Sequence, residues 1–235
     1  MFTISDFKAK RKSSLAIIQA YVHCELNDGT FLIGDATGHA MLSLYANPQF
    51  GTNISEGRCI KLLNPHFDVT KGVFTLMNNA TAIKCSPITY KPLEEDVLAG
   101  ISLDCHEIIK NLPPKSTLPT MIAKVIFVSH VRTSKDGAHR YCTIALKDLR
   151  GNRVAADVSD NNLEKVDWDC VYSFHNLKVA THKGEKRLVA EETSKISEVG
   201  EEVAGLFPPR GGEDTDDGEL KGINFLLAPY EDDVA

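Results

Sequence analysis

The sequence predicts an all-β protein built from two five-stranded barrels in tandem. Short apolar and β-branched segments alternate with turn signals, and no long helical periodicity interrupts them. The same order of segments occurs twice along the 235 residues. These observations divide the chain into a basic N-terminal arm (1–14), a first barrel (15–86), a partly helical linker (87–119), a second barrel (120–198) and a disordered acidic tail (199–235).

Composition is typical of an intracellular globular protein. Hydrophobic residues make up 43% of the chain and charged residues 25%, which is sufficient for an apolar core. No apolar run approaches the ~20 residues of a membrane span, and the first residues lack the form of a signal peptide. The six cysteines show no C-x-x-C spacing. We therefore expect reduced core thiols, with neither a metal site nor a cofactor.

The net charge of −6 is unevenly distributed. Residues 1–86 carry +2 and residues 120–190 carry +4, whereas residues 191–235 carry −10. Two basic segments followed by an acidic C-terminal segment are typical of a protein that binds a polyanion. The alternative is a tail that only aids solubility. The basic cluster at 8–12 is a nuclear localisation signal, an arm that touches phosphate, or a solvated end.

The first barrel is predicted from five apolar segments. Asn27-Asp28-Gly29 and Asp35-Ala36-Thr37-Gly38 are strong turn signals between the first three. In the next pair of segments, Phe67 stands in a polar turn between a His and an Asp. Its ring either packs onto the core or is held out as a surface for stacking. The five expected strands are 15–26, 30–34, 40–46, 60–63 and 73–85.

Prolines punctuate the linker, and Asp104 with Glu107 three residues later indicates a helix N-terminus. A second set of strands follows, with a basic loop at 132–137, a turn at 148–152 and a short helix at 161–165. The expected strands of this barrel are 121–131, 140–147, 153–158, 170–180 and 186–191.

The two sets repeat with matching turns. Asp35-Ala36-Thr37-Gly38 corresponds to Asp148-Leu149-Arg150-Gly151 at an offset of 113, and both aspartates are expected to form their turns. Trp168, between two aspartates, is expected to pack at the base of the second barrel. The chain ends in apolar residues beside acids, which is typical of a docking peptide: Phe225, Leu226, Leu227 and Tyr230.

This arrangement resembles tandem OB-folds of the replication protein A large-subunit type, over about 15–86 and 120–198. The resemblance depends on the turn at 35–38 with its following strand, on the segment 171–180, and on the loop that presents Phe67. It implies that Tyr45 and Phe67 stack on bases. The second repeat has Val158, His182 and Lys183 where those stacking residues would stand, so its barrel either tracks phosphates or contacts protein.

Alternation along the strand 140–147 places Tyr141 and Lys147 on the outer face, with Arg153 on the next strand. Aromatic faces bind bases, and basic side chains bind phosphates. The phosphate-binding candidates are Arg58, Lys61, Lys71 and Lys84 in the first barrel, and Arg132, Lys135, Lys147, Arg153, Lys178, Lys183 and Arg187 in the second.

The sequence contains no P-loop, H-E-x-x-H or G-x-S-x-G motif, so we expect no enzyme. The main hypothesis is a nuclear single-stranded DNA-binding protein of replication, repair, recombination or telomere maintenance, with DNA favoured over RNA. Its acidic tail would recruit a protein partner or compete with nucleic acid for the basic groove. The alternative is a non-enzymatic OB-fold scaffold that binds protein partners in a repair or telomere complex.

Overall fold

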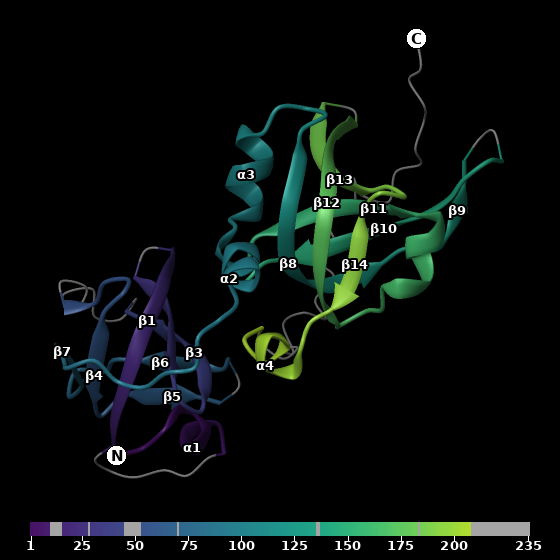
Figure 1. The fold of residues 1–235 in the computed structure, drawn as a ribbon. Coiled ribbons are helices and arrows are strands. Elements are labelled where there is room, and N and C mark those ends of the chain that lie inside the picture. The colour runs from purple at the N-terminus through teal and green to yellow at the C-terminus, as the bar shows by residue number, and fades with distance from the viewer. Residues whose placement is uncertain are drawn as a thin grey trace. The chain divides into compact units, whose positions relative to one another are not determined.

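The structure is a computed structural model of the 235-residue chain (Figure 1). It forms two compact units: Met1–Glu94 with a return segment that begins at Gly200, and Glu95–Val199. Each unit contains one β-sheet. The residues described are 1–9, 16–27, 29–44, 53–69, 71–134, 137–182 and 184–207.

The sheet of the second unit closes into a five-stranded barrel. Its antiparallel strands pair in sequence order at the start, and a parallel pair between β11 and β13 closes the ring. This is the strand order of the OB-fold, so the all-β prediction is confirmed here. Around the ring the strands are β8 (Thr117–Val128), β10 (Arg140–Lys147), β11 (Arg153–Ser159), β13 (Glu185–Ala190) and β12 (Val171–His182). In addition, β9 (Arg132–Thr133) pairs with β10, and β14 (Lys195–Glu198) pairs with β12.

The sheet of the first unit has seven strands, in the order β5-β6-β3-β2-β1-β4-β7. β6 runs parallel to β3, and β4 pairs with β1. The expected strand 73–85 is divided into β6 and β7, and β5 lies in the segment predicted as a polar turn. Between β4 and β5 stand Asn64, with φ 50°, and Pro65, which has no N–H to donate. The strands are β1 (Ile17–Asn27), β2 (Thr30–Asp35), β3 (Gly38–Ser43), β4 (Cys59–Leu63), β5 (His66–Asp68), β6 (Val73–Thr75) and β7 (Thr81–Lys84).

The N-terminus is not a polar arm over its first nine residues. Helix α1 (Ile4–Lys8) begins at Thr3, which forms a capping box with Asp6. Ile4 and Phe7 are buried in the core of the first unit. Ile4 and Phe7 are three residues apart and therefore lie on one face of the helix. Because a helix this short is hard to recognise in a sequence, the segment was expected to be a polar arm. The remainder of the basic cluster lies outside the described residues.

The linker is shorter and more helical than predicted. Helices α2 (Glu95–Ser102) and α3 (Cys105–Asn111) belong to the second unit, and β8 already begins at Thr117. The predicted cap is present, since the Glu107 N–H donates to Asp104 Oδ1 at 3.0 Å. Ile109 contributes to the barrel core. The expected short helix at 161–165 is the 3₁₀ helix η2 (Asp160–Lys165).

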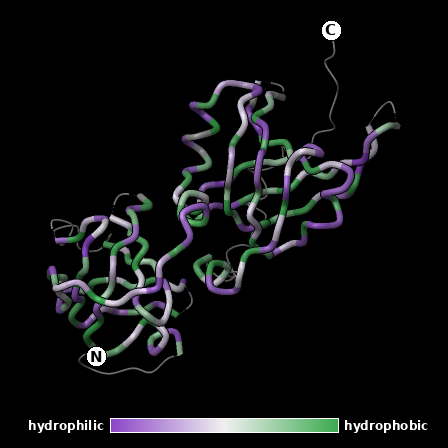
Figure 2. Tube along the Cα trace, viewed as in Figure 1, coloured by the Kyte–Doolittle hydropathy of each residue, from purple (hydrophilic) through white to green (hydrophobic). Residues whose placement is uncertain are grey.

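Residues 201–207, predicted as the start of the disordered acidic tail, are structured. Helix α4 (Glu201–Ala204) belongs to the first unit, and Leu206 and Phe207 after it are buried. Figure 2 shows hydrophobic and hydrophilic residues interspersed along the strands of each unit, as expected for sheets with one face on a core. Among the described helices, none is long and apolar enough to cross a membrane.

Candidate nucleic-acid interface

The outer face of β10 and β11 in the second unit carries the predicted groove residues. Cys142, Ile144 and Leu146 point into the barrel core, as expected from the alternation. The residues between them face outward, and each pairs with an outward residue of β11. These cross-strand pairs are Tyr141–Ser159, Thr143–Asp157, Ala145–Ala155 and Lys147–Arg153.

An apolar strip crosses the middle of this face. The ladder between β8 and β10 shifts register at Ala145/Leu146, and the extra residue on β8 is Ile126. Both Ile126 and Phe127 therefore pack outward against Ala145 and Ala155, away from the core. Phe127 is half-buried and lies opposite Ala145. This aromatic could not be recognised as an outer-face residue from the sequence, because a bulge reverses the alternation that would otherwise assign one of the two residues to the core.

Each end of the strip has a basic residue on the same face. At one end Lys147 and Arg153 are directly opposite each other across β10 and β11. At the other end Arg132 of β9 lies opposite Tyr141. All four side chains are half-buried. The structure therefore brings together four of the predicted site residues, two of them as a cross-strand basic pair.

The prediction that Arg187 binds phosphate is wrong. The residue is 5% exposed, and Nη1 donates to Asp157 Oδ2 at 2.8 Å. The other carboxylate oxygen of Asp157 accepts from the Thr143 hydroxyl at 2.7 Å. A buried guanidinium already paired with a carboxylate is not available to a phosphate, because breaking the pair would leave Asp157 as an uncompensated buried charge.

Of the three other predicted basic residues of this unit, the structure describes one. Lys178 forms an ion pair with Glu191. Lys135 and Lys183 lie outside the described residues.

Trp168 does not pack at the base of the barrel: it is 48% exposed, and its indole N–H donates to the Ile126 carbonyl at 3.0 Å. Trp168 therefore lies beside Ile126, the first residue of the apolar strip.

In the first unit the structure corrects the assignment of Phe67. The ring lies on strand β5, is 8% exposed, and packs in the core against Phe7 and Phe74 at centroid distances of 6.3 and 4.6 Å. A ring this deeply buried offers no surface on which a base could stack. Phe7 lies in the segment that was expected to be a polar arm, so the partner that buries Phe67 was not recognised. Tyr45, the other predicted stacking residue, lies outside the described residues.

The basic candidates of the first unit do not form one groove. Lys61 pairs with Ile83, while Lys84 pairs with Ile60, whose side chain is in the core. Because neighbouring residues alternate between faces, Lys61 and Lys84 point to opposite sides of the sheet. Arg58 precedes β4 and Lys71 lies in the turn between β5 and β6; both are exposed.

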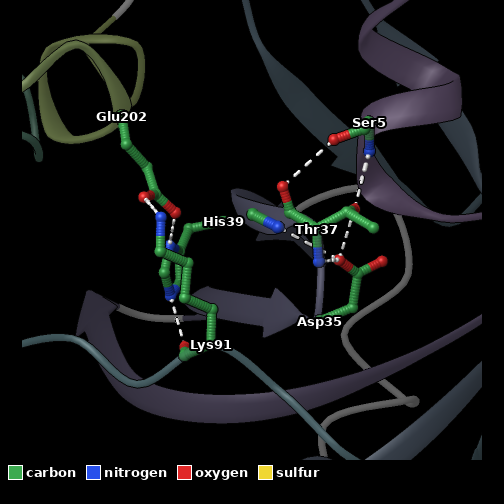
Figure 3. A network of polar contacts seen from close by, with 7 residues as sticks. Ser5, Asp35, Thr37, His39, Lys91 and Glu202 are labelled. Carbon is green, nitrogen blue, oxygen red and sulfur yellow. Dashed lines mark hydrogen bonds and ion pairs between the residues drawn. The ribbon is translucent and has the colours of Figure 1, made fainter.

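The outer face of the first unit holds parts of its own chain. The rings of Tyr21 and Tyr90 stack with a centroid distance of 3.9 Å and an interplanar angle of 1°. Figure 3 shows Glu202 of α4 reaching His39 on β3, with Nδ1 donating to Oε1 at 2.6 Å. Glu202 also pairs with Lys91, whose carbonyl oxygen lies 2.9 Å from His39 Nε2. Both nitrogens of the ring thus face acceptors.

His23 lies beside this network, with its ring 4.9 Å from that of His39. Its Nε2 is buried and has no hydrogen-bond partner. Burial, followed by the neighbouring His39, lowers the pKa of His23 to about 4. The ring is therefore neutral at physiological pH. Nothing in the turn-and-strand pattern of the sequence indicated this cluster, because its members come from four separate segments.

Comparison with known proteins assigns the chain to no family. No protein-family model matches the chain, and no curated protein matches its sequence. Among the described residues, no cluster of side chains could hold a metal ion. The predicted docking residues Phe225, Leu226, Leu227 and Tyr230 lie outside the described residues.

Solved structures with similar folds include a murine DNA-binding protein bound to double-stranded DNA, with 15% identity, a TM-score of 0.33, and coverage of 77% of this chain and 97% of the other. A replication protein A heterotrimer bound to single-stranded DNA has 13% identity, a TM-score of 0.35, and coverage of 93% and 55%. The OB domain of a Thermoplasma acidophilum protein has 17% identity, a TM-score of 0.30, and coverage of 34% and 73%.

Proposed function

We propose that this protein binds single-stranded nucleic acid, with DNA favoured over RNA, on the outer face of β8, β10 and β11. The observation that carries the proposal is an apolar strip on that face with basic residues at both ends. The strip offers ring faces to bases, and the ends offer cations to phosphates. Stacking on an aromatic contributes about 1–3 kcal/mol for each base, largely independent of sequence.

Each residue has a role that its position supports. Phe127 and Tyr141 are the stacking candidates, one in the strip and one at its end beside Arg132. Lys147 and Arg153 act together on phosphate because they lie opposite each other. Three cations that neutralise three phosphates of a single strand give a salt slope of roughly −2 in log K against log salt concentration.

The experiment is fluorescence-anisotropy binding of the full chain to a labelled 30-nucleotide single strand over a series of salt concentrations. Lys147→Ala/Arg153→Ala should weaken binding and reduce the salt slope by roughly 1.4. The matched control is Lys165→Ala/Lys195→Ala, which removes the same charge from exposed positions of the same unit. Tyr141→Ala should weaken binding with the slope unchanged. Equal effects of the two charge variants, or no binding at low salt, would contradict the proposal.

The finer assignments belong to the same proposal. The strand order of the first sheet, with its parallel β3–β6 pair, supports an OB-fold in which two strands are interrupted. A tandem pair of this kind suits replication, repair, recombination or telomere maintenance in the nucleus. A fluorescent fusion that stays outside the nucleus would contradict the localisation.

A second candidate function concerns the first unit. Its outer face already holds polypeptide, through the Tyr21–Tyr90 stack and the Glu202–His39 contact. This observation favours a protein-binding scaffold for that unit, with the C-terminal residues 225–230 as a further docking segment. If Lys61→Ala leaves DNA affinity unchanged while the second-unit variants reduce it, the two units have separate functions.

A further inference from the structure

Three residues form a row across the outer face of the first unit. Cys59 of β4 pairs with Tyr21 of β1 on one side. On the other side the ladder pairs Ile60 with Lys84, which places Cys59 opposite Cys85, the residue that follows β7. The Cys85 N–H donates to the Cys59 carbonyl at 3.1 Å, so the ladder continues through this pair. The two cysteines are therefore direct cross-strand neighbours.

The spacing of such a pair suits a disulfide. Residues opposite each other at a hydrogen-bonded position of an antiparallel ladder have Cα atoms about 5.5 Å apart. Disulfides bridge Cα separations of roughly 4.4–6.8 Å, most often near 5.5–6 Å. Side chains of opposite residues also point to the same face. The backbone thus already holds the two sulfur atoms on one side of the sheet.

The two thiols are accessible without disturbing the core. Ile60, which follows Cys59 on β4, points inward and is buried, as are Leu62 and its partner Ala82 further along the ladder, whereas Cys59 and Cys85 are half-buried on the outside. Of the other cysteines, Cys24, Cys105 and Cys142 are buried and Cys170 is exposed in the other unit. Cys59 and Cys85 are therefore the pair that combines access with proximity.

We propose that Cys59 and Cys85 form a reversible disulfide, closed by a small-molecule disulfide such as oxidised glutathione. The thiolate of one cysteine attacks the oxidant, forms a mixed disulfide and releases one glutathione thiol. The thiolate of the second attacks the mixed disulfide and releases the other. The two thiol protons end on the two released glutathione thiols, and the two electrons lost by the cysteines reduce the oxidant. Excess reduced glutathione reverses both steps.

Electrostatics set the conditions of this exchange. Burial, and then the neighbouring Cys59, raise the pKa of the Cys85 thiol, while Lys61 lowers it. Because the thiolate is the attacking species, exchange should accelerate as the pH rises. Lys61 lies two residues from Cys59 on the same face of β4. Lys61→Ala should therefore slow the exchange without abolishing it.

The test is peptide mapping of the full chain after equilibration with glutathione redox buffers, acid quenching and alkylation. Trypsin releases Cys59–Lys61 and a peptide from Cys85 to Lys110, because the Lys91–Pro92 bond resists cleavage. Oxidising buffers should link these two peptides, and fragment ions distinguish Cys85 from Cys105 within the longer one. Cys59→Ser and Cys85→Ser should each lose the link, whereas Cys170→Ser should retain it.

Dependence on protein concentration separates this bridge from chance oxidation. An intramolecular bridge forms at the same glutathione ratio at all protein concentrations and runs as a monomer on a non-reducing gel. Disulfide-linked dimers in its place would overturn the proposal. So would separate glutathione adducts on Cys59 and Cys85 with no cross-link, or two thiols that remain free to alkylate at the most oxidising ratio.

Discussion

Asp35 and Asp148 make the same two-sided contact in the two units. Asp148 Oδ1 accepts from the Asn152 N–H at 2.8 Å, within its own turn, and Oδ2 accepts from the Cys105 N–H at 3.0 Å. Asp35 Oδ1 accepts from the Thr37 N–H at 2.7 Å, and Oδ2 accepts from the Ile4 N–H at 2.7 Å. In each unit one carboxylate thus joins the turn between two strands to the first residue of a helix.

This relationship extends the internal repeat beyond the strands. Ile4 is the first residue of α1 and Cys105 is the first residue of α3, and both are buried. In each unit a helix therefore precedes the sheet and has its N-terminus held by the corresponding turn. Free N–H groups at a helix start require acceptors, and a carboxylate there also interacts favourably with the helix dipole.

The first prediction concerns this contact. Asp148→Asn keeps the shape but replaces one acceptor oxygen with an amide donor, which leaves either the Cys105 or the Asn152 N–H without its partner. We expect a loss of about 1–3 kcal/mol in the free energy of unfolding. Urea unfolding followed by the fluorescence of Trp168, the single tryptophan, reports on this unit. Asp167→Asn, at an exposed position, is the control; equal stability of the two variants would refute the role.

Much of the second unit could be predicted from its sequence. The turn at 148–152, the alternation of Cys142, Ile144 and Leu146, and the Asp104 cap are local patterns, and each has the predicted structure. What failed depends on distant partners. Arg187 is buried by Asp157, thirty positions away, and Phe67 by Phe7 of the N-terminal helix. Period and turn chemistry carry no information about such pairs.

The second prediction concerns the buried ion pair. Arg187→Met leaves Asp157 charged and without its cation in a buried site, so we expect a loss of about 3–5 kcal/mol. The salt slope of DNA binding should remain at the wild-type value, because Arg187 contacts Asp157 and not phosphate. Trp168 fluorescence in urea gives the first quantity and anisotropy the second. Lys195→Met, exposed on β14, should change neither, and a reduced slope in Arg187→Met would reinstate Arg187 as a phosphate contact.

The third prediction concerns a close approach in the first unit. A Cβ at Gly34 would lie 2.6 Å from His23 Nε2 and 2.7 Å from His39 Cδ2. Gly34→Ala should therefore destabilise this unit by about 1–3 kcal/mol. Far-UV circular dichroism should show an earlier transition that Trp168 fluorescence does not follow. Gly200→Ala, where the added Cβ meets nothing within 4 Å, is the control.

The same clash gives a double-variant test. His23→Ala removes the ring that the new methyl group would meet. Gly34→Ala combined with His23→Ala should therefore cost less than the sum of the two single changes. Additive losses would show that the two residues do not meet in this way.

The last prediction is a pH dependence due to His23. Burial and His39 lower its pKa to about 4, against an ordinary value of 6.5. The unfolded chain therefore binds a proton between these two values where the folded chain does not, and stability falls as the pH drops through that window. From pH 7 to pH 5 the loss should be about 2 kcal/mol. His23→Gln should remove this part of the pH dependence in urea unfolding followed by circular dichroism, whereas His66→Gln, at an exposed position, should leave it intact. Parallel pH profiles for wild type and His23→Gln would show that His23 titrates alike in the folded and unfolded chain.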